Sequence, residues 1–331
     1  MRGVLLLALT AAPLARPLVS PLQAQGPAAV RVSADNDAFN FWLPPWARTD
    51  RDYTSGFAGS LDFHGRIGWL RLPGRLEARR SARNGFTRTH SYTVGQAIYT
   101  GEVVSNDGGE RSTRPNAGWL YFEVSEQDSS DRMAEEFRLA VGVVGPPALG
   151  EKMQRLFHSI APEYQRPVDW ARQLPAEPGF IARYTRTSRV AAFGIGSRWS
   201  GRLDSRAGVA LGTVLTSVTG GGTARFSVPL GSPSAMQRGR WPSFEFSAEV
   251  LAHAVLRDEF VDGTFFRSSE RLARSPFQDE ERASLALHWS QVSVAYRVTR
   301  LSVQYHGQPS PASWGTLSTE WRPGGRTRQA R

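Results

Sequence analysis

The residues best suited to chemistry lie in a short stretch whose pattern differs from the rest of the chain. Between Ala148 and Ile160, apolar residues recur every three or four positions, which predicts an amphipathic helix. Gln154 and His158 are four residues apart, so their side chains would lie on one face, one turn from each other. An imidazole exchanges protons near neutral pH, which makes His158 a candidate general base, and Gln154 could orient water or a ligand. Read alone, a single histidine also suits a purely structural role.

Oxygen-bearing side chains earlier in the chain offer a second kind of chemistry. The carboxylate of Asp37 and the side-chain oxygens of Asn36 or Thr54 are hard ligands of the kind that calcium prefers. A cation held there could stabilise negative charge on a carbonyl oxygen while a base deprotonates water. Read alone, Asn36-Asp37 also suits a turn or a strand end, and Thr54 an ordinary strand start. The remaining histidines show no metal-ligand spacing; they are His64, His90, His253, His288 and His306.

Composition excludes several classes of function. The chain contains no cysteine, so thiol nucleophiles, disulfides and cysteine-ligated metals are ruled out. The formal net charge of +10 comes almost entirely from arginine, and Lys152 is the only lysine. A basic chain suits polyanions, either nucleic acid or phosphorylated lipid. The arginines are scattered and no nucleic-acid-binding module is recognisable, so the lipid is favoured and no nucleic-acid partner is expected.

The N-terminus predicts export. A positive start, Met1-Arg2-Gly3, precedes an apolar stretch too short to span a bilayer, which is typical of a secretory signal peptide. Cleavage after Ala24 would leave residues 25–331 as one mature domain. Prolines at 13, 17 and 21 disfavour a buried N-terminal helix there. No later run of about 18 apolar residues occurs, so an exported chain of this kind is either soluble or a β-barrel.

Alternation of apolar and polar residues predicts an all-β fold. In residues 53–63, Phe57, Leu61 and Phe63 share one face while Thr54 and Gly56 share the other, so Thr54 is expected to point inward. Residues 136–143 and 244–257 repeat the pattern. Weaker candidates are 29–35, 90–99, 117–125, 179–187, 190–199, 205–217, 282–289, 291–299, 300–306 and 313–321. We therefore expect a transmembrane antiparallel β-barrel of about 12 strands with one short amphipathic helix. A soluble β-sandwich is the alternative, because strand periodicity does not distinguish lipid from a second sheet.

Several short runs, taken in order, resemble signatures of the lipid A 3'-O-deacylase family. The resemblance covers nearly the whole mature chain, from about Val30 to Trp321. The runs are Asn36-Asp37-Ala38-Phe39, Tyr53-Thr54-Ser55-Gly56, Gly95-Gln96-Ala97-Ile98-Tyr99-Thr100, Arg114-Pro115-Asn116-Ala117-Gly118-Trp119-Leu120-Tyr121, Gly142-Val143-Val144-Gly145-Pro146, the helix with Gln154 and His158, Trp170 to Glu177, and Asp262-Gly263-Thr264-Phe265-Phe266.

The resemblance implies a fold, an activity and a set of site residues. It implies a twelve-stranded outer-membrane barrel whose active site lies between the wall and a short helix, on the outer-leaflet side, and which hydrolyses the 3' ester of lipid A with calcium. The matching positions here are Asn36, Asp37, Thr54, Gln154 and His158, with the first three as the expected Ca²⁺ ligands. The family's active-site lysine has no counterpart, since the stretch after Thr100 offers Glu102 and Val103; Arg111 or Arg114 would have to replace it.

The sequence therefore predicts a monomeric bacterial outer-membrane enzyme. In this hypothesis His158 activates water, Ca²⁺ stabilises the oxyanion, and the substrate is lipid A within lipopolysaccharide. A phospholipase with a serine nucleophile and a histidine partner is a second possibility. A third is a catalytically decayed barrel that binds anionic lipid or acts as a porin, which the missing lysine favours.

Overall fold

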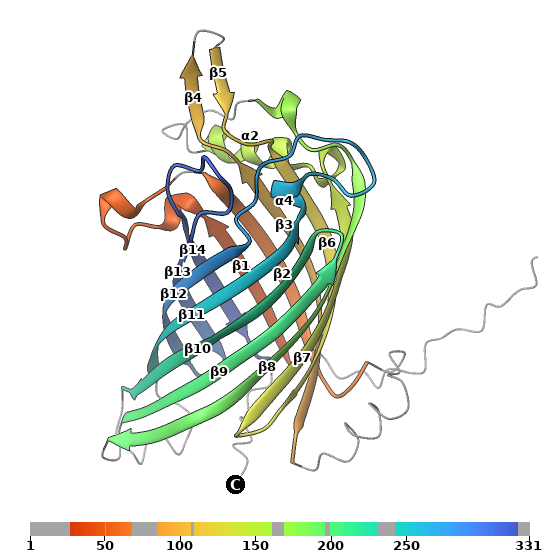
Figure 1. Cartoon of the computed structure of the whole chain (residues 1–331). Coiled ribbons are helices and arrows are strands. Elements are labelled where there is room, and N and C mark those ends of the chain that lie inside the picture. Colours follow the sequence, from red (N-terminus) through yellow and green to blue (C-terminus); the bar gives the residue numbers. More distant parts are fainter. Residues whose placement is uncertain are drawn as a thin grey trace, which may run out of the picture.

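The computed structural model describes residues 27–49, 51–67, 85–106, 109–160, 169–195, 199–230 and 242–323. The expected signal peptide, residues 1–24, lies outside these ranges. Within them the chain forms a closed barrel with longer loops gathered at one end and the end of β14 at the other (Figure 1). Long loops are typical of the extracellular end of a bacterial outer-membrane barrel. None of the helices in the described ranges is both long enough and apolar enough to cross a bilayer.

The barrel contains twelve antiparallel strands and is closed by β1 pairing with β14. Its order is β1-β14-β13-β12-β11-β10-β9-β8-β7-β6-β3-β2. The strands are β1 (Ala29–Asn36), β2 (Asp52–His64), β3 (Thr87–Thr100), β6 (Ala117–Ser129), β7 (Met133–Val144), β8 (Glu177–Ile195), β9 (Trp199–Gly212), β10 (Leu215–Pro229), β11 (Ser243–Asp258), β12 (Phe277–Trp289), β13 (Val292–Leu301) and β14 (Ala312–Trp321). The barrel prediction is confirmed, and the sandwich alternative is wrong, because one continuous ladder closes on itself.

Side-chain alternation separates an apolar outer face from a polar lumen. On β11, Phe246 and Val250 are 49% and 61% exposed on the outside, while Glu245 and Glu249 point inward. Phe57 and Leu61 of β2 are likewise exposed on the outside. Such a wall satisfies every backbone group within the sheet and presents apolar side chains outward, as lipid requires.

Some strand boundaries differ from those predicted. Residues 179–187 and 190–199 were expected as two strands, but a single strand, β8, covers the whole of the first segment and residues 190–195 of the second. The segment 205–217 was expected as one strand, yet it contains the end of β9, the turn at Thr213-Val214 and the start of β10. Residues 302–306, part of the segment expected as a strand over 300–306, follow the end of β13. The glycines at 220–222 leave β10 with little apolar alternation, which is why the pattern missed most of it.

The inward orientation expected for Thr54 is wrong. The β2–β3 ladder pairs Tyr53 with Tyr99 and Ser55 with Ile98, so Thr54 is an extra residue in a bulge. Tyr53 lines the lumen, and its hydroxyl donates to Asp35 at 2.7 Å. A bulge inserts one unpaired residue and shifts the alternation, which local sequence does not reveal.

The shorter elements gather mainly in the loops at the loop-rich end. They are η1 (Asp37–Phe39), η2 (Pro45–Ala47), the hairpin of β4 (Val103–Asn106) and β5 (Gly109–Ser112), η3 (Pro146–Ala148), α2 (Gly150–Ile160), η4 (Trp170–Arg172) and α4 (Glu259–Asp262). The amphipathic helix expected over Ala148–Ile160 is confirmed as α2. The residues Pro146–Ala148 before it form the 3-10 turn η3.

Candidate active site

Asn36 and Asp37 lie where β1 turns into η1. The side-chain oxygen of Asn36 accepts a hydrogen bond from the Ala38 amide at 2.8 Å, which caps η1. Both side chains are buried. The turn lies directly on Gly315 of β14, where an added Cβ would overlap the Phe39 carbonyl. Glycine at 315 therefore lets η1 fold close against the outer face of the wall.

Thr54 makes its closest polar contact with the next strand. Its hydroxyl lies 2.5 Å from the Thr100 hydroxyl at the end of β3. Thr100 shares the alternation of Val94, which is exposed on the outer face. The bulge thus leaves the Thr54 hydroxyl beside the outward-facing residues of β3.

Helix α2 and the turn before it cover the outer face of β3 and β6. Gly118 of β6 lies against Ala148 and Gly150, so there is little room for a side chain at 118. The amide nitrogen of Gln96 donates to the Ala148 carbonyl at 2.5 Å. Ile98 alternates with outward-facing residues but is only 3% exposed. The helix is therefore outside the barrel and shields this part of the wall from lipid.

Gln154 and His158 have different surroundings on α2. The Gln154 carbonyl oxygen accepts a hydrogen bond from the Trp170 indole at 2.7 Å, and this contact is buried. His158 is half-buried, with the Phe157 ring edge-on to it, and its Nδ1 is enclosed without a hydrogen-bond partner among the described residues. A polar atom in that position gains stability from a partner such as water or a ligand hydroxyl. Gln154 ties the helix to η4, whereas the Nδ1 of His158 is buried without a partner among the described residues.

Strand register aligns one residue each from β14, β1, β2, β3 and β6 in a row at the rim of the barrel. Gly315 pairs with Asn36, Asn36 with Ser55, Ser55 with Ile98 and Ile98 with Gly118. We name these five residues the outer rim row. Neighbouring strands are about 4.8 Å apart, so Asn36 and Gly118 are separated by about 14 Å. The turn η1 covers one end of the row and α2 the other, with Thr54 between them.

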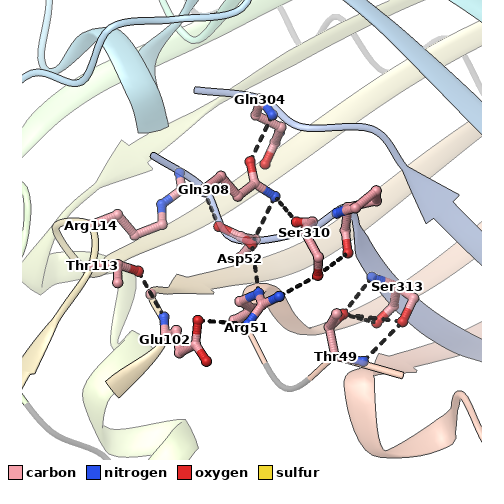
Figure 2. A network of polar contacts seen from close by, with 12 residues as sticks. Thr49, Arg51, Asp52, Glu102, Thr113, Arg114, Gln304, Gln308, Ser310 and Ser313 are labelled. Atoms are coloured by element: carbon pink, nitrogen blue, oxygen red, sulfur yellow. Dashed lines mark hydrogen bonds and ion pairs between the residues drawn. The ribbon is translucent and has the colours of Figure 1, made fainter. Parts of the chain in front are cut away.

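A polar network at the rim fixes the start of β2 (Figure 2). Arg51 forms an ion pair with Glu102 at 2.7 Å and donates to the Ser310 hydroxyl. Asp52 accepts hydrogen bonds from the Gln308 amide at 3.0 Å and the Tyr305 hydroxyl at 3.1 Å. The network joins the segment before Thr54 to the loop before β14, and so holds the two ends of the η1 loop together.

Arg114, one of the two candidates to replace the family's lysine, is engaged in buried contacts. It is fully buried, and its guanidinium contacts Asp52 at 3.4 Å and the Phe260 carbonyl at 2.6 Å. It also lies over the rings of Tyr99 and Tyr305. These contacts hold Arg114 inside the loop-rich end of the barrel, which we call the mouth. Arg114 therefore does not lie on the outer rim row. The side chain of Arg111, the other candidate, lies outside the described residues.

Arg51 is a further arginine at the rim, which the sequence analysis did not single out. It neighbours the stretch after Thr100 through its ion pair with Glu102, in the region where the family's lysine was sought. The only lysine, Lys152, is exposed on α2. No signal in the sequence singles out Arg51 among the many arginines, because its position depends on pairing between distant segments.

A buried pair of carboxyl groups lies near the same end of the barrel. Glu259 of α4 is completely buried, and burial together with the neighbouring Glu177 raises its pKa to about 9. Glu177 accepts hydrogen bonds from the amides of Phe265 and Phe266 at 2.5 and 3.0 Å. Glu259 is therefore protonated at neutral pH beside a carboxylate that two backbone donors stabilise.

The expected calcium ligands fit the ion by donor chemistry. Asn36, Asp37 and Thr54 provide only oxygen atoms, one of them a carboxylate, and calcium accepts neutral oxygens and water as well. Within the described ranges no three histidine, aspartate or glutamate side chains are grouped to hold a metal. Imidazole and thiolate, which softer transition metals prefer, are not among the three expected ligands.

Comparison with known proteins decides the family. The family described as outer membrane protein LpxR matches residues 4–323 of this chain. The chain belongs to the LpxR family. It is therefore a bacterial outer-membrane β-barrel protein, which agrees with its apolar outer face.

The solved structure of an LpxR protein has the same fold. LpxR from Salmonella typhimurium is 16% identical, with a TM-score of 0.67 over 88% of this chain and 99% of that one. The β domain of the Bordetella autotransporter BrkA is 9% identical, with a TM-score of 0.48 over 90% of this chain and 100% of that one. No curated protein sequence matches this chain. The twelve-stranded closed barrel with a short helix is thus the LpxR fold.

Proposed function

We propose that this protein is a lipid A deacylase that hydrolyses the ester-linked 3' acyl or acyloxyacyl chain. Its membership in the LpxR family supports this activity. The observation that carries the proposal is the outer rim row, where η1 and α2 flank Thr54 on the lipid-facing side of the wall. A site on that face is reached from the membrane rather than from the lumen.

The surroundings of the site suit an amphiphilic ester of the outer leaflet. On α2 and just before it, Leu149, Met153 and Leu156 are 43%, 43% and 53% exposed, and they offer contacts for acyl chains. Polar side chains at the rim, among them Thr54, Thr100 and Arg51, lie at the level where a headgroup would be. Lipid A has this combination of phosphate-bearing sugar and several acyl chains.

In the proposed mechanism, His158 acts as the general base. Its imidazole accepts a proton from a water molecule as the water oxygen attacks the ester carbonyl carbon. The tetrahedral intermediate then collapses, and the histidinium returns the proton to the departing sugar oxygen. The products are a free carboxylic acid and the sugar hydroxyl. Gln154 positions the helix through Trp170 and so fixes where the imidazole lies.

Oxygens of Asn36, Asp37 and Thr54 would hold the calcium ion. When bound, it supplies positive charge that polarises the ester carbonyl. The cap from Asn36 to Ala38 orients the turn, and the contact with Gly315 limits its movement. These two contacts thus hold the side-chain oxygens of Asn36 and Asp37 in a fixed position beside the outer face of the barrel.

The proposal is tested by mass spectrometry of lipid A from Gram-negative cells that express the wild type, His158→Ala or Lys152→Ala. We expect lipid A to lose the mass of one acyl or acyloxyacyl group with the wild type and with Lys152→Ala, but not with His158→Ala. Lys152 is the matched control because it is exposed on the same helix. A heat-dependent shift in gel migration verifies that each barrel is folded.

The outcomes separate the competing functions. Deacylation retained in folded His158→Ala would remove His158 from the mechanism. Fatty acid released from phospholipid with unchanged lipid A would support the phospholipase instead. No change in either lipid with folded wild-type protein would support the inactive barrel.

A further inference from the structure

The lumen contains two adjoining cavities with volumes of about 640 and 360 Å³. Five residues line both of them, namely Arg138, Arg183, Arg282, Ser284 and Arg297. We name this group the arginine neck. It lies inside the barrel, on the opposite face of the wall from the outer rim row.

Carboxylates along the smaller cavity neutralise only some of its arginines. Six arginines and two glutamates line it. Glu249 forms ion pairs with Arg206 at 3.0 Å and with Arg282 at 2.7 Å. Glu136 pairs with Arg138 at 2.8 Å. Both glutamates are therefore already engaged, and the cavity retains an excess of positive charge.

Three of the six arginines have no carboxylate in ion-pair contact among the described residues: Arg183, Arg225 and Arg297. Arg297 donates only to the Ser284 hydroxyl, at 3.2 Å. Register places Arg225 beside Ser247, Ser247 beside Ser284 and Ser284 beside Arg297, so two hydroxyls lie between the two guanidinium groups. Arg183 comes from β8, which is almost opposite β13 in the strand order.

Guanidinium groups in this arrangement require an anion. Cations inside a protein are costly unless a counter-charge is close, and no described carboxylate is in ion-pair contact with these three. Guanidinium binds tetrahedral oxyanions through paired N–H donors, and serine hydroxyls add further donors. We propose that the lumen binds a phosphate-type oxyanion between Arg183, Arg225 and Arg297. This site is separate from the proposed deacylase site and does not depend on it.

Calorimetric titration of inorganic phosphate into the purified barrel, in a non-ionic detergent, tests the site. The wild type is compared with the double variant Arg183→Gln/Arg297→Gln. We expect saturable binding by the wild type and a dissociation constant at least about tenfold larger for the variant, because two charge-assisted contacts are lost. Deacylation of lipid A should be unaffected, since both residues face the lumen.

Arg186→Gln/Arg300→Gln is the matched control. Each of these arginines is three residues from its counterpart on the same strand, so it projects from the outer face, and the charge removed is the same. Phosphate binding should match the wild type. Equal loss in both double variants, or only non-saturable binding by the wild type, would show diffuse counterions and overturn the proposal.

Discussion

Glu259 shows how one buried side chain couples folding to pH. Its carboxyl is fully buried beside Glu177, and burial raises its pKa to about 9 from an ordinary value of 4.5. The folded protein therefore binds this proton more tightly than the unfolded chain does. The resulting stability is complete below about pH 4.5 and is lost as the pH rises towards 9.

Glu259→Gln should flatten this dependence. The amide stays neutral at every pH, so the melting temperature of the detergent-solubilised variant should fall less than that of the wild type between pH 5 and pH 9. Glu281→Gln is the control, because Glu281 is 56% exposed in a surface ion pair. Identical slopes for the wild type and Glu259→Gln would contradict the assignment of the titrating group.

At the scale of elements, glycines determine how closely the covering segments approach the wall. The turn η1 lies against Gly315, and the start of α2 lies against Gly118. Strand glycines are usually weak points in a sheet, but here they allow a second layer of backbone on its outer face. The spacing of η1 and α2 along the outer rim row follows from these two contacts.

Gly315→Ala should lower deacylation while the barrel stays folded. The added methyl group overlaps the Phe39 carbonyl and would push Asn36 and Asp37 away from the wall. We expect a loss of roughly tenfold to a hundredfold in kcat/KM, because small displacements of positioning groups have effects of that size. Initial rates on purified lipid A give the measurement.

Gly59→Ala provides the comparison for that variant. Gly59 lies in β2, and an added Cβ there meets nothing within 4 Å. Its activity should equal that of the wild type. Full activity in folded Gly315→Ala would show that the position of η1 does not limit the reaction.

At the scale of the whole molecule, the mouth of the barrel is closed by packed side chains. Phe260 of α4 stacks on Tyr99 with ring centroids 3.9 Å apart and belongs to a buried apolar cluster with Trp119 and Leu174. Arg114 is held beneath it by Asp52 and the Phe260 carbonyl. These contacts join α4, β3, β2 and the segment before β6 across the mouth.

The wild-type protein should therefore give no stepwise conductance in planar lipid bilayers. Apolar constrictions exclude water and ions, and this one is also tied to the rim by buried hydrogen bonds. The measurement is current at fixed voltage after insertion of the purified barrel. Stable conductance steps from folded wild-type protein would favour the porin.

The sequence by itself determined the class of fold and proposed the residues of the site. Period-two alternation in 53–63 and 244–257 is a local property, and it predicted a lipid-facing wall because each strand has one face towards lipid. The three-and-four spacing of apolar residues around Gln154 and His158 is also a local property, and it predicted α2 because it places those residues on one face of a helix. The motif from Asn36 to Phe39 was identifiable because it is contiguous.

Only the tertiary structure decided the features that depend on pairing between distant strands. The bulge that turns Thr54 from the lumen exists only in the β2–β3 ladder. Arg114 is a structural cation in the mouth because Asp52 and Phe260 reach it from other segments. Among the described residues Arg183 has no carboxylate in ion-pair contact, because strand register pairs it with Arg138 and Ala210. In each case a side chain takes its role from its partners, and closure of the barrel selects those partners.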